Sequence, residues 1–462
     1  MKTRYTLRRY LTGAVAARAG DEMAGPALML AAFALSGSGS GAAFRAAALL
    51  AGVTVAAAVG GPVLGALLDR ARRPGRLLAV ALALYATGLG TVLAGLGRLP
   101  FGVTLALAVL TGLLGPALSG GWTSQLPSVL PPDRLPRANA LDALTFSAAS
   151  LAGPALAGGV AETLGAPAAV VASLALIAAA LPAAWTLPAR PRGTPEAPAP
   201  HTASAAPRPP KPPARGPVAP VLAARLVRSA RALRAARAVV STRAARSARS
   251  ARSARAIRAV LGDVVAGFRA IAGRPALAGA TLSSAVSCAA QGMFTACLPL
   301  LGARVLGEAG RGALLLSCTA VAAMAANAVL ARFPALLAPD TLLRAGALVQ
   351  AAATALAAGG RPGLLVAAAL LAGCGEGPQL TALFAIRHRE APARLRGQIF
   401  TTGASLKITG FAVGAAVAGP LAPYSLTGTL VLAAGVSVLA ALAPRLVRGS
   451  VPARPEPAPQ PQ

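Results

Sequence analysis

The chain has 462 residues, of which 55% are hydrophobic and only 12% are charged, and its mean hydropathy is +0.64. Charged residues make up about 25% of an ordinary soluble domain, so this composition excludes a typical soluble protein and favours a protein of the lipid bilayer. The net charge of +31 would suit a nucleic-acid-binding protein. Most arginines, however, lie between apolar runs with few aromatic residues to stack on bases, so no specific nucleic-acid partner is expected.

About a dozen apolar runs of roughly 20 residues are each long enough to cross the hydrocarbon layer as a helix. Barrel strands would need short alternating segments, and a large soluble helical protein is the less favoured alternative. The sequence therefore predicts an all-α membrane protein with 12 transmembrane helices. The expected helices are residues 10–35, 46–68, 77–97, 101–123, 138–163 and 166–187, then 276–301, 311–332, 341–359, 363–386, 397–421 and 424–443.

The first run follows a basic N-terminal stretch, as the apolar part of a signal peptide would. It contains Arg18, Asp21 and Glu22, which a signal peptide would not carry in that part, so we interpret it as a retained first span.

Arginine is dense in every second connection between the runs. Basic residues beside a span are retained on the cytoplasmic side, so this pattern predicts a multi-pass protein of the inner (plasma) membrane with cytoplasmic N- and C-termini. The expected organisation is a six-helix bundle over residues 1–187, a cytoplasmic linker over 188–262, a second six-helix bundle over 263–443 and a disordered cytoplasmic tail over 444–462.

The expected linker has two parts of different composition. Residues 188–220 are rich in proline and alanine, which is typical of an extended linker. Residues 221–260 repeat arginine at about every third position, so the charge spirals around a helix and leaves no fixed apolar face. This second part is expected either to attract anionic lipid headgroups or to be a low-complexity insert that only lengthens the loop.

The two halves resemble one another. Residues 112–118 followed by 132–135 have the same order of glycine, proline and arginine as residues 377–380 followed by 392–395. This similarity indicates an internal duplication, and two bundles related in this way place a cavity at their interface near the middle of the bilayer.

One loop between two predicted helices resembles the signature loop of the major facilitator superfamily, G-x-x-x-D-R-x-G-R-R. Here it reads Gly65, Asp69, Arg70 and Arg73 at the family spacing, with Arg72 at the second glycine and Pro74 at the last basic position. The resemblance implies two six-helix bundles with pseudo-twofold symmetry. It also implies that the aspartate pairs with basic residues of a neighbouring helix and acts as a conformational latch that stabilises one of two states. A residue that only moderates a positive turn is the alternative.

A second motif lies in the fifth predicted helix, where Gly153, Pro154, Gly158 and Gly159 resemble the G-P-x-x-G-G antiporter motif of exporters, with Ala157 at the first paired glycine. Small residues allow close helix approach and proline loosens the helix, although packing alone could also explain the pattern. Residues 132–141 and Gly20-Asp21 resemble the enterobactin-exporter and macrolide-efflux branch, a group of drug:proton antiporters.

Ionisable residues within spans are candidates for substrate or proton binding, because an unpaired charge there is costly. Asp21 and Glu376 come from opposite halves, so both are expected to face the central cavity, with Lys407 nearby. Structural pairs of Arg18 with Asp21 and of Glu376 with Lys407 are the alternatives, and Glu22 is expected to be interfacial or paired. Neutral candidates for ligand recognition, which could equally join helices, are Gln125, Gln291, Asn327 and Gln379.

The function expected from these features is proton-coupled efflux of a small amphipathic compound, a drug or metabolite, by alternating access. With aromatic residues at 3%, the cavity is expected to be lined by alanine, leucine and small residues. A proton-coupled importer and a membrane scaffold acting through the basic segment are the alternatives. No enzyme activity, metal or cofactor is expected, and the expected partners are a small-molecule substrate, protons and membrane lipids, with the chain acting as a monomer.

Overall fold

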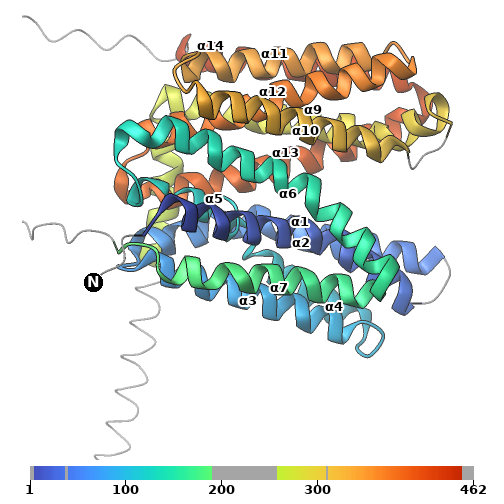
Figure 1. The fold of residues 1–462 in the computed structure, drawn as a ribbon, viewed down its shortest axis with the longest axis horizontal. Coiled ribbons are helices and arrows are strands. Elements are labelled where there is room, and N and C mark those ends of the chain that lie inside the picture. The colour runs from blue at the N-terminus through green and yellow to red at the C-terminus, as the bar shows by residue number, and fades with distance from the viewer. Residues whose placement is uncertain (1–4, 37–39, 190–257, 308–310, 450–462) are drawn as a thin grey trace, which may run out of the picture. The chain divides into compact units, whose positions relative to one another are not determined.

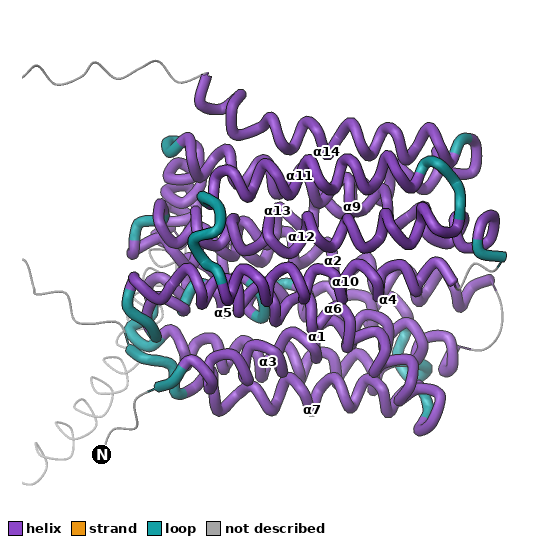
Figure 2. Tube along the Cα trace, turned by 45° about the horizontal axis from the view of Figure 1, so that its top comes forward, coloured by secondary structure: helices purple, strands orange, loops and turns teal. Residues whose placement is uncertain are grey.

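The computed structural model describes residues 5–36, 40–189, 258–307 and 311–449, and all regular structure in these ranges is helical (Figure 2). Most of the predicted linker, residues 190–257, lies outside the described residues, as do residues 450–462 of the predicted tail.

Within the described residues, six of the predicted spans form helices before the predicted linker and six form helices after it (Figure 1). The first six are α1 (Leu7–Ser36), α2 (Ser40–Arg70), α3 (Pro74–Gly95), α4 (Phe101–Gly112), α6 (Leu135–Leu164) and α7 (Ala166–Trp185). The later six are α9 (Pro275–Val305), α10 (Gly312–Arg332), α11 (Pro339–Ala357), α12 (Pro362–Glu390), α13 (Arg396–Tyr424) and α14 (Leu426–Gly449). A further helix covers residues 258–272. The predicted all-α architecture of twelve spans is confirmed.

Ten segments of the described chain are long and apolar enough to cross a membrane. The other two predicted spans are α1 and α11. Charged side chains interrupt the apolar character of α1 near its middle, and α11 carries Asp340 and Arg344. Both helices nevertheless pack among the apolar spans, α1 against α6 and α7, and α11 against α12 and α14.

The fourth predicted span is not one continuous helix. It stops after Gly112, continues as a short 3-10 turn over Gly115–Ala117 and resumes as α5 (Gly120–Thr123). Pro116 has no N–H to donate to the helical ladder, which explains the interruption. The sequence predicted an unbroken helix over residues 101–123, and the prediction was wrong at this point.

Proline and glycine mark several helix boundaries. Proline occupies the first turn of α3, α9, α11 and α12, where its missing N–H costs no hydrogen bond. Gly165, with φ +92°, makes the turn from α6 into α7, a backbone conformation that other residues rarely adopt.

The helices pack against one another both within each half and between the halves. In the first half α1 lies between α6 and α7, and in the second half α9 contacts α13 and α14 while α12 contacts α10 and α11. Contacts between the halves join α2 and α5 to α13, and α6 to α10 and α12. The contacts between the halves therefore run along α2, α5 and α6 on one side and along α10, α12 and α13 on the other.

Candidate functional site

A cavity of about 400 Å³ lies midway along the helices, lined by α1 and α6 from the first half and by α9 to α14 from the second. This volume falls in the range of small-molecule sites, roughly 300–1,000 Å³. Its charged lining residues are Glu22, Glu376 and Lys407. Alanine, leucine and other small residues line it as expected, and three phenylalanine side chains that were not expected line it as well, Phe146, Phe294 and Phe411.

The two adjacent carboxylates of α1 point in different directions. Glu22 lines the cavity, as does Ser150 on α6. Asp21 instead accepts a hydrogen bond of 2.7 Å from the hydroxyl of Tyr85 on α3. Consecutive helical residues differ by about 100° in direction, so only one of the two can face the cavity. The sequence analysis expected Asp21 to face the cavity, whereas the structure places Glu22 in its lining. The sequence of α1 alone does not indicate which side of the helix faces the second half.

Glu376 on α12 and Lys407 on α13 both line the cavity. Both also line a side chamber of about 20 Å³ with Ser284, Cys288, Gln291 and Gln379. A chamber of this size holds about one water molecule or one small polar group. The structure thus brings Glu376, Lys407, Gln379 and Gln291 to one place.

A chain of side-chain amides runs along the wall beside Glu376. Gln291 donates to Gln350 at 3.3 Å, Gln350 donates to Gln379 at 2.8 Å, and Gln379 donates to the Ser287 hydroxyl at 2.8 Å. The sequence reasoning did not single out Gln350. The amphipathic pattern of α11 could have indicated a buried face, but nothing in it identified a partner for this amide.

Asn327 and Gln125, the other two predicted recognition residues, lie away from the cavity lining. Asn327 is fully buried and accepts a hydrogen bond of 2.9 Å from Thr381, which joins α10 to α12. Gln125 follows α5 and donates to the hydroxyl of Ser124 at 2.8 Å. The Asn327 contact joins two helices, which is the alternative that the sequence left open, whereas the Gln125 contact is local to its own segment.

The antiporter-like motif of α6 touches the cavity at its first two residues. Pro154 lines the cavity, and Gly153 lies so close to α1 that an added Cβ would come within 2.6 Å of the Cβ of Glu22. Gly158 and Gly159 face open space, with nothing within 4 Å of an added Cβ. The close approach at Gly153 sets the position of the Glu22 backbone against α6.

Both halves meet at the end of the protein where the dense arginines lie, which we call the arginine-rich end. Its arginines include Arg70, Arg72, Arg73, Arg76, Arg134, Arg137, Arg332, Arg387, Arg389, Arg394 and Arg396. Here the carboxylate of Asp69, near the end of α2, accepts hydrogen bonds of 2.9 Å and 2.8 Å from the backbone N–H groups of Gly397 and Gln398. These N–H groups belong to the first turn of α13, which has no partner for them within the helix and where a negative charge is stabilised by the helix dipole.

The remaining residues of the predicted latch surround this contact. Gly65 allows the backbone of α2 to lie directly against Gln398, because a Cβ there would collide with the Gln398 Cα. Arg70 forms an ion pair with Asp263, which follows the predicted linker, and Arg73 is the residue that precedes the first turn of α3, exposed on the surface. The first-half carboxylate therefore binds helix N–H groups of the second half at the predicted position.

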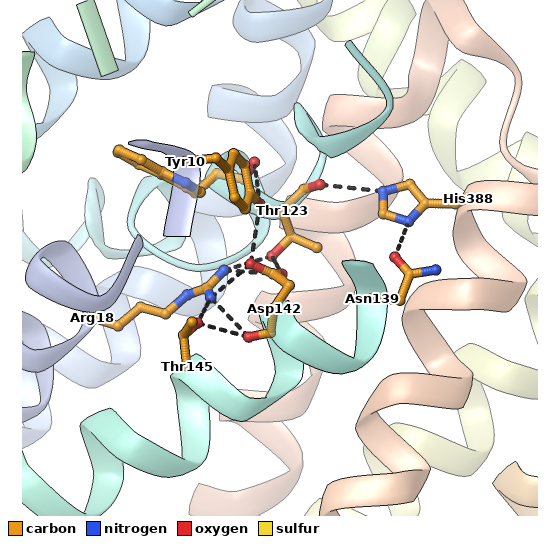
Figure 3. Close-up of polar contacts among 8 residues, drawn as sticks. Tyr10, Arg18, Thr123, Asn139, Asp142, Thr145 and His388 are labelled. Atoms are coloured by element: carbon orange, nitrogen blue, oxygen red, sulfur yellow. Dashed lines mark hydrogen bonds and ion pairs between the residues drawn. The ribbon is translucent and has the colours of Figure 1, made fainter. Parts of the chain in front are cut away.

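A second contact between the halves involves a buried histidine (Figure 3). Nδ1 of His388 on α12 lies 2.9 Å from the amide oxygen of Asn139 on α6, and its Nε2 lies 3.2 Å from the carbonyl oxygen of Thr123 on α5. Its ring packs on Phe400 with centroids 4.5 Å apart. All of these side chains are buried, so the arginine-rich end is closed by polar and apolar contacts.

A buried ion pair joins two helices of the first half beside this contact. Arg18 on α1 pairs with Asp142 on α6 at 2.9 Å, and Asp142 also accepts hydrogen bonds from Tyr10 at 3.1 Å and Thr123 at 2.9 Å (Figure 3). The Arg18 guanidinium lies over the ring of Phe146 at 3.7 Å. Of the alternatives raised for Arg18, pairing with Asp21 is therefore wrong, and Asp142 is a site residue that the sequence reasoning missed.

Taken together, two helix bundles, a cavity lined from both of them and a closed end define a multi-pass membrane protein of the transporter class. A profile of the Major Facilitator Superfamily matches residues 10–337. An uncharacterized MFS-type transporter of Sinorhizobium fredii (strain NBRC 101917 / NGR234), y4rN, is 30% identical over 346 residues, which cover 74% of this chain and 70% of that protein. This chain belongs to the Major Facilitator Superfamily and has the alternating-access fold of its transporters.

Solved structures show the same fold at low sequence identity. A bacterial homologue of the iron transporter ferroportin in an outward-facing state has a TM-score of 0.66 at 14% identity, covering 96% of this chain and 99% of that one. The human organic anion transporter MFSD10 (TETRAN) has a TM-score of 0.66 at 15% identity, covering 96% and 100%. A single-substitution variant of the E. coli fucose:proton symporter FucP has a TM-score of 0.64 at 12% identity, covering 96% and 99%.

Proposed function

We propose that this protein is a secondary active transporter that exports a small amphipathic compound, a drug or metabolite, in exchange for protons. The observation that carries the proposal is that Glu22 and Glu376, from the two halves of the chain, line the same cavity. A carboxyl group in such a cavity can bind a proton in one state and release it in the other. The proton gradient is the energy source, and we propose no cofactor.

The proposed orientation places the arginine-rich end, both termini and the linker in the cytoplasm of an inner membrane, because basic residues beside spans are retained there. In this orientation the closed end is the cytoplasmic gate, so the structure corresponds to a state that faces outward. Both bundles belong to one chain, so a monomer supplies the complete site. The motif at Gly153 and Pro154 supports an antiporter, and the resemblance of residues 132–141 and Gly20-Asp21 supports placement in the enterobactin-exporter and macrolide-efflux branch of drug:proton antiporters.

Transport in reconstituted vesicles tests this proposal. A thermal-shift screen of the purified protein identifies a ligand, and its movement is then measured with and without an imposed pH gradient. We expect the gradient to drive the ligand in the direction opposite to the protons and a protonophore to stop it. Movement in the same direction as the protons would show import by symport, and movement unaffected by the gradient would contradict proton coupling.

Substitution of either cavity carboxylate is expected to uncouple substrate transport from the pH gradient. Glu22→Gln or Glu376→Gln removes a proton-binding group while keeping the size of the side chain, so the pH gradient should no longer drive transport in the same vesicles. Glu162→Gln is the matched control, because Glu162 is exposed near the far end of α6 and should leave coupling intact. Full gradient-driven transport in both cavity variants would contradict the assignment.

A further inference from the structure

The helix that precedes α9 touches both halves of the protein at the arginine-rich end. We call its final part, residues 263–272, the strap. Asp263 forms an ion pair with Arg70 at the end of α2, and the carbonyl oxygen of Val264 accepts a hydrogen bond of 2.9 Å from the side chain of Gln398 in the first turn of α13. The strap therefore joins the same two helices that meet at the closed end.

One side of the strap is packed against the second half. Gly267 is buried, and an added Cβ there would collide with the side chain of Gln398. Ile271 is only 8% exposed and packs in one apolar cluster with Leu395 and Ile399. Gly267 and Ile271 are one helical turn apart, so they lie on the same side of the strap. This inner side holds the strap in place and leaves the outer side for another contact.

The outer side of the strap is apolar with an arginine beside it. Val265 is 46% exposed and Phe268 is 45% exposed, and Ala272 is exposed as well. Their spacing of three and four residues places them in one stripe along the helix. Arg269, which is also exposed, follows Phe268 and flanks this stripe. An apolar stripe beside a basic residue is typical of a helix that lies at the boundary between lipid headgroups and acyl chains.

The strap lies at the level of that boundary. Gly273 and Arg274 separate it from the membrane span that begins at Pro275. At the same end of the protein the ring of Trp185 is 52% exposed, with the guanidinium of Arg76 over it at 5.2 Å. Exposed tryptophan rings and arginines that reach past them are found where the headgroups of a membrane lie. Lipid is therefore the molecule expected next to the outer side of the strap.

We propose that the strap is a binding surface for anionic phospholipid that stabilises the closed arginine-rich end. Its apolar stripe enters the leaflet at that end, and Arg269 binds the phosphate of the lipid. When the end opens, α2 and α13 separate, and the strap keeps its attachment to only one of them. Lipid that holds the strap flat against both helices therefore favours the closed state over the open one. The proposal depends on neither the substrate nor the direction of transport.

A fluorescent label on the apolar stripe tests what covers it. Phe268→Cys is introduced into the full-length protein after its native cysteines have been replaced by serine, and a nitrobenzoxadiazole dye is attached in vesicles of phosphatidylcholine and phosphatidylglycerol. We expect lipids with a nitroxide near the headgroup to quench the dye strongly and iodide in the water to quench it weakly. Strong quenching by iodide alone would place the stripe in water. Protection from both quenchers would show that protein covers it, and either result would overturn the proposal.

The effect of lipid charge on the closed end is measured with spin labels at the exposed positions 133 and 335. In nanodiscs that contain phosphatidylglycerol we expect a ratio of closed to open protein about fivefold higher than in phosphatidylcholine alone, the effect of one basic residue near an anionic surface. Arg269→Gln should remove this increase. Arg98→Gln is the matched control, because Arg98 is exposed between α3 and α4 at the opposite end. The same increase in the Arg269→Gln protein would overturn the role of Arg269.

A charge on the apolar stripe tests whether insertion of the strap supports the closed end. Phe268→Asp should lower the closed fraction in the nanodiscs with phosphatidylglycerol, because a carboxylate is repelled by the anionic surface and cannot enter the apolar layer. Leu164→Asp is the control, since Leu164 is 73% exposed at the opposite end, where α6 finishes. A folded Phe268→Asp protein, verified by its size-exclusion profile, with the closed fraction of the unmodified protein would overturn the coupling between lipid and the closed end.

Discussion

Replacing Asp142 with alanine is expected to lower the free energy of unfolding by about 3 to 5 kcal/mol, the usual cost of removing one partner of a buried ion pair. The Arg18 and Asp142 side chains are 2% and 0% exposed, so the guanidinium left behind would have no water to solvate it. Tyr10 and Thr123 would each lose one hydrogen-bond acceptor as well. Thermal unfolding in detergent measures the loss.

Asp133→Ala provides the matched control for this prediction. Asp133 lies in the turn directly before α6, the helix that carries Asp142. Its side chain is 73% exposed, so its removal should change stability by no more than about 0.5 kcal/mol. A double variant with Arg18→Met and Asp142→Leu should recover much of the stability lost in Asp142→Ala, because no uncompensated charge remains. Equal stability of Asp142→Ala and Asp133→Ala would contradict the structural role of the pair.

Replacing Gly65 with alanine is expected to hold the arginine-rich end open. A Cβ on Gly65 would collide with backbone atoms of Gln398, and backbone cannot move aside as a flexible side chain can. If α2 and α13 move apart to relieve this collision, Asp69 is also drawn away from the N–H groups of Gly397 and Gln398. Because overpacking costs typically about 1–3 kcal/mol, we expect the closed population to fall about tenfold or more, the effect of about 1.4 kcal/mol.

Distances between spin labels at the exposed positions 133 and 335 measure this opening across the two halves. The Gly65→Ala protein should show longer distances than the unmodified protein. Gly419→Ala is the control on α13, since an added Cβ there meets nothing within 4 Å, and it should leave the distances unchanged. Identical distance distributions in Gly65→Ala and Gly419→Ala would contradict the closing role of this contact.

The fold could be predicted because its signals are local. Apolar runs of membrane length, proline in first turns and arginine between runs each depend on neighbouring residues, and they predicted the helices to within a few residues at most boundaries. The interruption after Gly112 was missed because Pro116 lies in an otherwise continuous apolar run.

The candidate site could be predicted only in part, because its contacts depend on the relative placement of helices. Glu376 and Lys407 were singled out from their charge within a span, and the structure brings them together. The rotation of α1 decides between Asp21 and Glu22, and no local pattern reports it. Asp142 was missed because its partner Arg18 is distant in the sequence, on another helix.

The most direct test of alternating access at this cavity is the side from which a cavity residue can be labelled. Ser150 lines the cavity beside Glu22, so Ser150→Cys is introduced after the native cysteines Cys288, Cys297, Cys318 and Cys374 have been replaced by serine. A membrane-impermeant maleimide is then applied to either face of the membrane. We predict labelling from the face opposite the arginine-rich end, with reactivity appearing at the arginine-rich face when Gly65→Ala is added. Labelling only from the arginine-rich face without that substitution, or the same sidedness with and without it, would contradict a gate formed by these contacts.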